Sequence, residues 1–275
     1  MYSRATPFEK SDNLIGTHQK IDRAARLTLR QVYKKTYGED IDEIFPKINQ
    51  ILKFEGNNGP DGIKVKSPGK DEPWHFVEPY GDLSQMFSYA ENHIYNLSQA
   101  LKQDNRVRAS FEAAWLAHAV TDALTPAHQY PMEDKIIEIS GKSPSERDKL
   151  IKKLFLPGET RSERIKFNWE YIGSKGVMST HMLYEFGVAT LISPVRPRTI
   201  SRQPSKTDVN LILNDKYLEV FEDKIKKVAD RHYYQRYMQS GWNGSLARET
   251  KSVLLPEIST MVALSWLTAI HEAKK

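Results

Sequence analysis

The chain has 275 residues, enough to bury a sizeable core without staples, and its 39% hydrophobic and 27% charged content is ordinary for a globular domain. It contains no cysteine, which excludes disulfides, thiolate metal sites and cysteine nucleophiles, so any metal must be held by nitrogen and oxygen ligands. The net charge of +5 is compatible with an anionic substrate or surface but does not require one.

Apolar residues recur with a helical period along most of the chain. In chain order, the pattern predicts helices over residues 14–35, 83–101, 107–124, 143–154, 177–191, 207–239 and 254–272. The helix over 107–124 is apolar on most of its surface, which favours a position inside a bundle. The most apolar stretch, 253–270, is broken by Pro256 and Glu257, so we expect a buried helix there and no transmembrane segment.

Two irregular stretches interrupt these helices. Residues 56–79 hold four glycines and four prolines and are predicted to form a long loop, and residues 193–206 are rich in proline and basic side chains. No run of alternating strands and no internal repeat is recognisable. The sequence therefore predicts an all-α, multi-helix bundle, a single domain over residues 1–275, with one long loop laid across it.

Two pairs of potential metal ligands have the spacing of one helix face. His118 and Asp122 are four residues apart in WLAHAVTDALTPAHQYP, and His181 and Glu185 repeat this spacing in STHMLYEFG. His128 follows the first pair closely. A single such pair is weak support for a metal, but burying a carboxylate in the central helix is expensive unless a cation compensates it. Imidazole and carboxylate groups suit zinc.

Together these motifs resemble the zinc-dependent phospholipase C family, which shares its fold with the single-strand-specific nucleases of fungi and plants. The family pattern is His-x3-Asp-x5-His followed by His-x3-Glu, or by His-x3-Asp in the nucleases. An early helix opening with Thr-His is matched by GTHQKIDRAARLTL, which carries His18. An Asp followed fourteen residues later by His-Phe is matched by Asp61, His75 and Phe76. The closing segment ISTMVALSWLTAIHEA is also similar, and the likeness is greater to the bacterial phospholipase C branch.

The resemblance implies a multinuclear zinc site inside the bundle. The first ion would be held by Asp61, His75, His118 and Asp122, the second by His128, His181 and Glu185, and the third by His18 and a bridging Asp122. At the third ion the family also uses the amino group of an N-terminal tryptophan. Because the first tryptophan here is Trp74, we expect two or three zinc ions.

The same resemblance implies hydrolysis of phosphodiesters, with phospholipid head groups cleaved by a metal-activated water and Asp61 as general base. Phe76 would stack on a nucleobase or contact a choline-like cation, or it packs the loop against the bundle. Glu78 would meet a cationic head group or a base edge, or it is a solvated loop residue. Asp22, four residues after His18, is predicted to be a solvated helix residue, because the family does not use that position.

Two alternatives stay open: a single-strand nuclease or nucleotidase on the same cluster, and a non-catalytic metal- or lipid-binding domain. The partner would accordingly be a phospholipid or a nucleic acid. Peripheral contact with a membrane surface is compatible with the resemblance, and no obligate protein partner is indicated. The resemblance implies a secreted or periplasmic protein, yet no signal peptide is recognisable, so a cytoplasmic location stays open. Residues 130–175 are longer than in the family and resemble an inserted arm or lid.

Overall fold

A computed structural model describes residues 16–62, 76–143, 146 and 155–275, and these residues contain helices and no strand. The all-α prediction is therefore confirmed for this part of the chain. The longer helices are α1 (Thr17–Tyr37), α4 (Ser84–Lys102), α5 (Arg106–Ala123), α6 (Met132–Ser140), α8 (Arg161–Ile172), α9 (Val177–Ile192), α11 (Lys206–Leu213), α12 (Tyr217–Ala229), α13 (Tyr233–Ser240) and α15 (Leu255–Lys274). Shorter elements are η1 (Ile41–Glu43), α2 (Ile48–Ile51), η2 (Leu52–Phe54), η3 (Gly56–Asn58), η4 (Pro126–Gln129), α10 (Pro197–Ile200), α14 (Gly244–Glu249) and the π-helical turn η6 (Thr250–Leu254).

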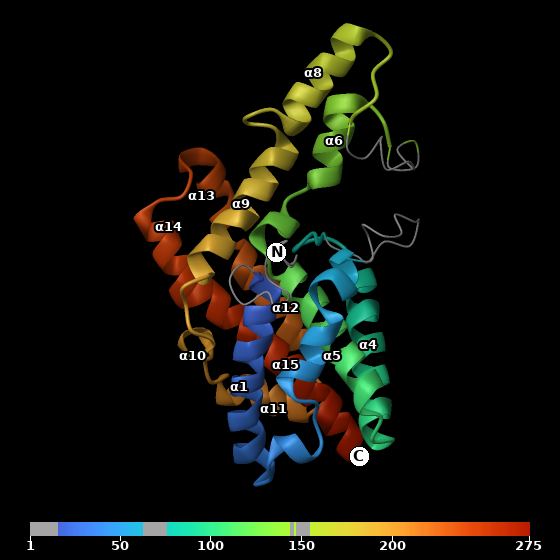
Figure 1. Cartoon of the computed structure of the whole chain (residues 1–275), viewed down its shortest axis with the longest axis vertical. Helices are drawn as coiled ribbons and strands as arrows, with labels where there is room; N and C mark the ends of the chain where they lie inside the picture. The colour runs from blue at the N-terminus through green and yellow to red at the C-terminus, as the bar shows by residue number, and fades with distance from the viewer. Residues whose placement is uncertain (1–15, 63–75, 144–145, 147–154) are drawn as a thin grey trace.

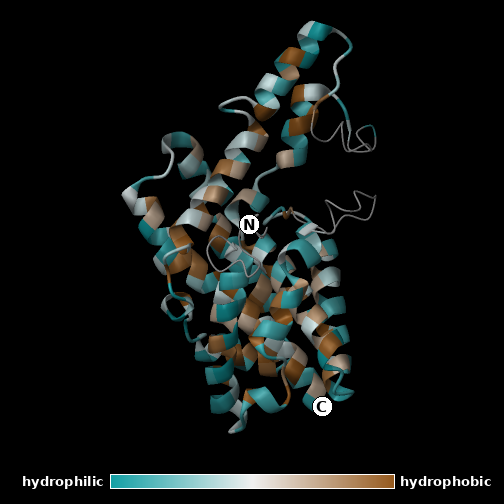
Figure 2. Ribbon diagram, in the orientation of Figure 1, coloured by the Kyte–Doolittle hydropathy of each residue, from teal (hydrophilic) through white to brown (hydrophobic). Residues whose placement is uncertain are grey.

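Helix α15 forms the centre of the bundle, with α1, α4 and α5 packed around it (Figure 1). It is buried along almost its whole length, and Trp266 is fully buried. The indole Nε1 of Trp266 donates a hydrogen bond to the carbonyl oxygen of Ala113 on α5, at 2.9 Å. These helices carry hydrophobic residues along their length (Figure 2), and many of them belong to the main buried core. The central position predicted for the 107–124 helix is also confirmed, since α5 is buried on most of its surface.

The continuous helical stretch Gly244–Lys274 is long and apolar enough to cross a membrane by length and composition alone. However, 89% of its most apolar window is buried inside the bundle. A helix surrounded by other helices of the same chain needs no lipid to cover its apolar surface. The expectation of a buried helix is therefore confirmed, and no other described helix has this length and composition.

Helices α6 and α8 project beyond the bundle as an arm (Figure 1). The arm has a small core of its own, which is separate from the main core and consists of Met132, Ile136, Leu156 and Tyr171. Asn168 ties α8 to the chain that precedes it, because its side chain both accepts from the Leu156 amide and donates to the Leu156 carbonyl, each at 2.9 Å. Most of the helix predicted over 143–154 lies outside the described residues.

Two features of the fold differ from the sequence predictions. The single helix expected over 207–239 is three helices, α11, α12 and α13, because Asp215 and His232 adopt left-handed backbone conformations with φ of 60° and 53°. A continuous helix cannot include such residues. The irregular stretch 193–206 contains one helical turn, α10. Of the predicted loop 56–79, only residues 56–62 and 76–79 are described, and the first of these pieces is helical rather than irregular.

Gly187 allows α9 to pack closely against the aromatic cluster around Trp242. A Cβ atom at this position would overlap the indole of Trp242, which itself stacks on Tyr184 at 5.2 Å between ring centroids. We therefore expect Gly187→Ala to destabilise the protein by about 1–3 kcal/mol, the usual cost of overpacking. The control is Gly244→Ala, because a Cβ there meets nothing within 4 Å. Urea unfolding measures both variants, and equal stability of the two would contradict this packing.

Candidate metal centre

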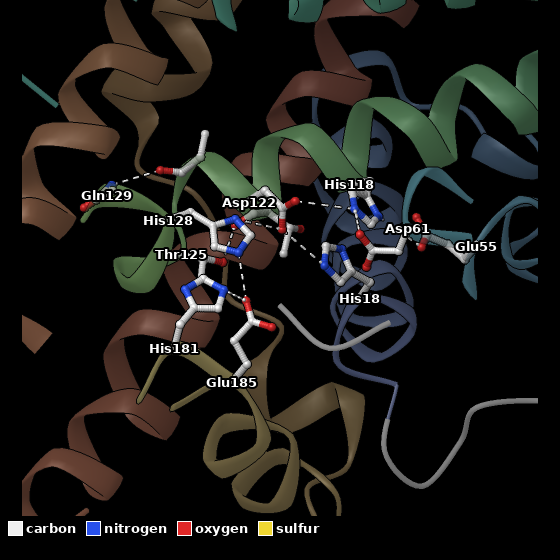
Figure 3. Close-up of polar contacts among 12 residues, drawn as sticks. His18, Glu55, Asp61, His118, Asp122, Thr125, His128, Gln129, His181 and Glu185 are labelled. Carbon is white, nitrogen blue, oxygen red and sulfur yellow. Dashed lines mark hydrogen bonds and ion pairs between the residues drawn. The ribbon is translucent and has the colours of Figure 1, made fainter. Parts of the chain in front are cut away.

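Asp122, on the last turns of α5, lies at the centre of the predicted ligand set (Figure 3). Its Oδ1 is 3.4 Å from His18 Nε2 and 3.4 Å from His128 Nδ1, while its Oδ2 is 3.4 Å from His118 Nε2. The side chain is only 1% exposed. One buried carboxylate therefore touches imidazoles from three different elements, as a bridging metal ligand would.

His18, Asp61 and His118 form the first group that can hold a metal ion, with ligand atoms that all lie within 4.8 Å of one another. The rings of His18 and His118 stack, with centroids 4.0 Å apart. Asp61 Oδ1 is 3.6 Å from His118 Nε2. The structure thus gathers residues from α1, from the segment after η3 and from α5, as Figure 3 shows.

His128, His181 and Glu185 form the second group, again with ligand atoms within 4.8 Å of one another. Glu185 Oε1 is 2.8 Å from His128 Nε2 and 3.2 Å from His181 Nε2. His181 and Glu185 are one turn apart on α9, so they share a face, as the spacing predicts.

The turn η4 fixes His128 beside the end of α5. Pro126 stands at the first positions of this turn, where its missing N–H costs nothing, and the His128 amide donates to the Thr125 carbonyl at 2.9 Å. The Gln129 side chain donates to the carbonyl of Ala123, the last residue of α5, also at 2.9 Å. These hydrogen bonds turn the chain back toward Asp122, so the three residues of the His-x3-Asp-x5-His motif lie close together.

Lys20 links helix α1 to the end of helix α9. It is 6% exposed, and its ammonium donates to the carbonyl oxygens of Ile192, at 2.8 Å, and Ser193, at the C-terminal end of α9. A cation is favourable there because the last carbonyls of a helix carry partial negative charge. The bond thereby holds α1, with His18, in a fixed position relative to α9, with His181 and Glu185.

The electrostatics of the centre are those of ligands that need a cation. Burial disfavours ionisation of Asp61, but the neighbouring His118 outweighs it and lowers the pKa of this carboxyl. Burial likewise opposes protonation of His118, yet Asp122, Asp61 and Glu55 raise its pKa well above the usual value. The surrounding carboxylates thus favour a positive charge at His118, because carboxylates are costly to bury without a compensating charge.

Two further buried carboxyl groups surround His118. Glu55 Oε2 is 3.4 Å from His118 Nδ1, and the Glu55 side chain is fully buried. Asp22, predicted to be solvated, is 1% exposed, and burial and the nearby Glu55 raise its pKa well above the usual value. The prediction for Asp22 was wrong, because a position four residues after His18 shares the buried face of α1. For Glu55 the sequence gives no spacing signal.

The donor set fits zinc or a similar divalent cation. It consists of imidazole nitrogens and carboxylate oxygens. His118 Nε2 faces the predicted ligand Asp122, and its Nδ1 faces Glu55, which is the place where a metal-binding imidazole usually has a supporting carboxylate. The part of the chain described here thus contains two buried groups that can hold metal ions. The identity of the metal stays a prediction.

Seven of the eight predicted ligands are described and lie together, whereas His75 falls outside the described residues. The grouping differs in one respect from the one implied by the resemblance. His18 lies with Asp61 and His118, on whose ring it stacks, as well as beside Asp122. The positions of these side chains therefore do not define a third metal site apart from the first group.

A cavity of about 320 Å³ adjoins the second group, and both predicted substrate-binding residues line it. The Phe76 ring lies 5.3 Å from that of His128 and 5.9 Å from that of His181, between centroids, while Glu78 is exposed. Sequence reasoning missed the rest of the lining, which includes Asp82, Tyr130, Met132, Glu133 and Asp134. No sequence motif connects these residues, because they come together only in the folded chain.

Comparison of the chain with protein-family models, with curated proteins and with solved structures finds no match. The resemblance to the phospholipase C family stays a prediction from the motifs.

We expect Glu55→Gln to weaken zinc binding about tenfold, because a neutral amide orients and polarises the His118 ring less than a carboxylate does. The control is Glu43→Gln, which changes an exposed side chain of η1. Competition with a chromophoric chelator measures both affinities. If the two variants bind zinc equally well, Glu55 does not support the ligand His118.

Zinc binding is also expected to strengthen as the pH rises from about 6 to about 8, a range in which a histidine with a strongly raised pKa still carries a proton that it must lose to bind an ion. His118 has a raised pKa, so it stays protonated at higher pH than an ordinary histidine and must lose its proton to bind an ion. Calorimetry in buffers of different ionisation enthalpy will then detect protons released on binding. An affinity that does not depend on pH over this range would contradict a protonated His118 in the metal-free protein.

Proposed function

We propose that the chain is a zinc-dependent phosphodiester hydrolase, similar to phospholipase C, that releases the head groups of phospholipids. The proposal depends above all on one observation. Two buried His/Asp/Glu groups lie on either side of Asp122, whose two oxygens face both of them. Adjacent metal positions of this kind suit a phosphoryl group, which presents several oxygens at once.

Zinc ions at these two groups would neutralise phosphoryl oxygens and make a water molecule acidic enough to attack near neutral pH. In the overall reaction, a water oxygen bonds to phosphorus, the bond from phosphorus to one ester oxygen breaks, and a proton from the water passes to the departing alcohol. Asp61 is the most exposed carboxylate of the set, at 25% against 14% for Glu185 and 1% for Asp122. In this proposal Asp61 would accept a hydrogen bond from the attacking water, and its lowered pKa favours an orienting role over that of a strong base.

The cavity beside Phe76 favours a phospholipid over a nucleic acid. Four of its lining side chains are carboxylates, namely Glu78, Asp82, Glu133 and Asp134, and two are the aromatic residues Phe76 and Tyr130. Carboxylates and aromatic faces attract a quaternary or primary ammonium group, whereas carboxylates repel the successive phosphates of a polynucleotide. The single-strand nuclease and the non-catalytic binding domain remain as alternatives that the following experiment separates.

The purified protein is expected to contain two zinc ions or more by mass spectrometry and to hydrolyse a chromogenic phosphocholine ester faster than single-stranded DNA. Asp122→Asn should lower the hydrolysis rate by about a thousandfold or more, since the lost Lewis-acid stabilisation amounts to several kcal/mol. Asp223→Asn, on the exposed side of α12 and paired with Lys227, should keep full activity. Circular dichroism establishes that both variants are folded.

Three results would overturn or redirect the proposal. Preferential cleavage of the DNA would identify the nuclease alternative. Full zinc occupancy without turnover of either substrate would identify the binding domain. Activity that survives both chelation and Asp122→Asn would separate the reaction from this centre altogether.

A further inference from the structure

Large apolar side chains are exposed along α8, in the arm, and along α9, the helix that follows it. On α8, Ile165, Trp169 and Ile172 are 63%, 68% and 40% exposed and are spaced four and three residues apart, so they form one stripe along the helix. On α9, Met182, Leu183 and Phe186 are each more than half exposed. We name these six residues the arm apolar face. Exposed apolar side chains gathered on neighbouring helices are a feature of interaction sites in soluble proteins.

None of the six residues of the arm apolar face is a predicted metal ligand. At 3.6 residues per turn, Leu183 lies on the side of α9 opposite His181, whereas Met182 is three residues from Glu185 and borders the ligand face. Helices α8 and α9 follow one another from the far end of the arm into the bundle (Figure 1), and apolar residues recur along α8 out to that end (Figure 2).

Basic side chains accompany the arm apolar face. Residues 161–175, which are α8 and the turn to α9, contain four Lys and Arg against two Asp and Glu. Arg161, Arg164 and Lys166 on α8, and Lys175 in the turn to α9, are exposed. Aromatic and aliphatic side chains interleaved with cations are the composition of helices that lie in a membrane interface.

We propose that the arm apolar face docks on an anionic lipid surface, with Trp169, Ile165 and Phe186 entering the boundary of the acyl chains and the neighbouring cations meeting lipid phosphates. A second copy of this chain is a poorer occupant, because a symmetric contact would bring the basic side chains of α8, Arg161, Arg164 and Lys166, against those of the other copy. This inference rests on the proposed function, because docking would bring a phospholipid hydrolase to its substrate. The binding itself is measurable without catalysis.

The test is co-sedimentation of the full chain with vesicles of phosphatidylcholine containing phosphatidylglycerol, and with vesicles of phosphatidylcholine alone. We expect binding to the mixed vesicles that weakens as salt is raised. The double variant Trp169→Ala with Phe186→Ala should bind the mixed vesicles about tenfold or more weakly, because each ring would bury a large apolar area in the membrane interface. Tyr95→Ala on α4, which removes an equally exposed aromatic ring from outside the arm, should bind as the parent does.

The outcomes distinguish the docking from the proposed function. Hydrolysis of a soluble phosphocholine ester by the double variant at the parent rate, together with lost vesicle binding, supports the docking role. Vesicle binding by a chain with no hydrolytic activity would leave the docking intact and overturn the proposed function. Docking is overturned if the parent chain does not bind the mixed vesicles, if Tyr95→Ala loses as much as the double variant, or if light scattering shows dimers that the double variant abolishes.

Discussion

The centre of this molecule depends on a carboxylate, Asp122, held almost without solvent among three imidazoles. A buried anion is tolerated only when positive charge and hydrogen bonds surround it. The elements around it meet this requirement in a definite way: α1 brings His18, α5 brings His118, and the turn η4 brings His128 back over the end of α5. Placing these imidazoles around one carboxylate requires the bundle to close with α5 inside it, so the arrangement of the helices and the chemistry of the centre are linked.

The next layer of side chains fixes the ligands. Glu55 faces the second nitrogen of His118, and Lys20 joins α1 to the end of α9. Neither residue is a predicted ligand, yet each constrains the position of residues that are. Metal sites commonly combine direct ligands with such supporting contacts, since a ring that can rotate binds an ion less tightly. The centre is therefore better described as a network that begins at Asp122 than as a set of separate ligands.

The sequence predicts the helices and most of the ligand set because both depend on local spacing. His118 with Asp122, and His181 with Glu185, share a helix face by geometry alone. The sequence does not predict the burial of Asp22, the approach of Glu55 or the cavity beside Phe76, because these depend on how distant segments pack. It also misses the two breaks between 207 and 239. Residues with left-handed backbone, such as Asp215 and His232, do not disturb the apolar period of the flanking helices. The period alone therefore does not reveal the two breaks.

The ligand groups unite segments that are far apart along the chain, from His18 near one end to Glu185 well past the middle. In a protein without cysteine, coordination of one ion by such segments closes long loops of the polypeptide, much as a disulfide does in a secreted domain. Unlike a disulfide, this closure is reversible and responds to the free concentration of the ion. The survival of the folded chain in a given environment would then follow the local supply of metal.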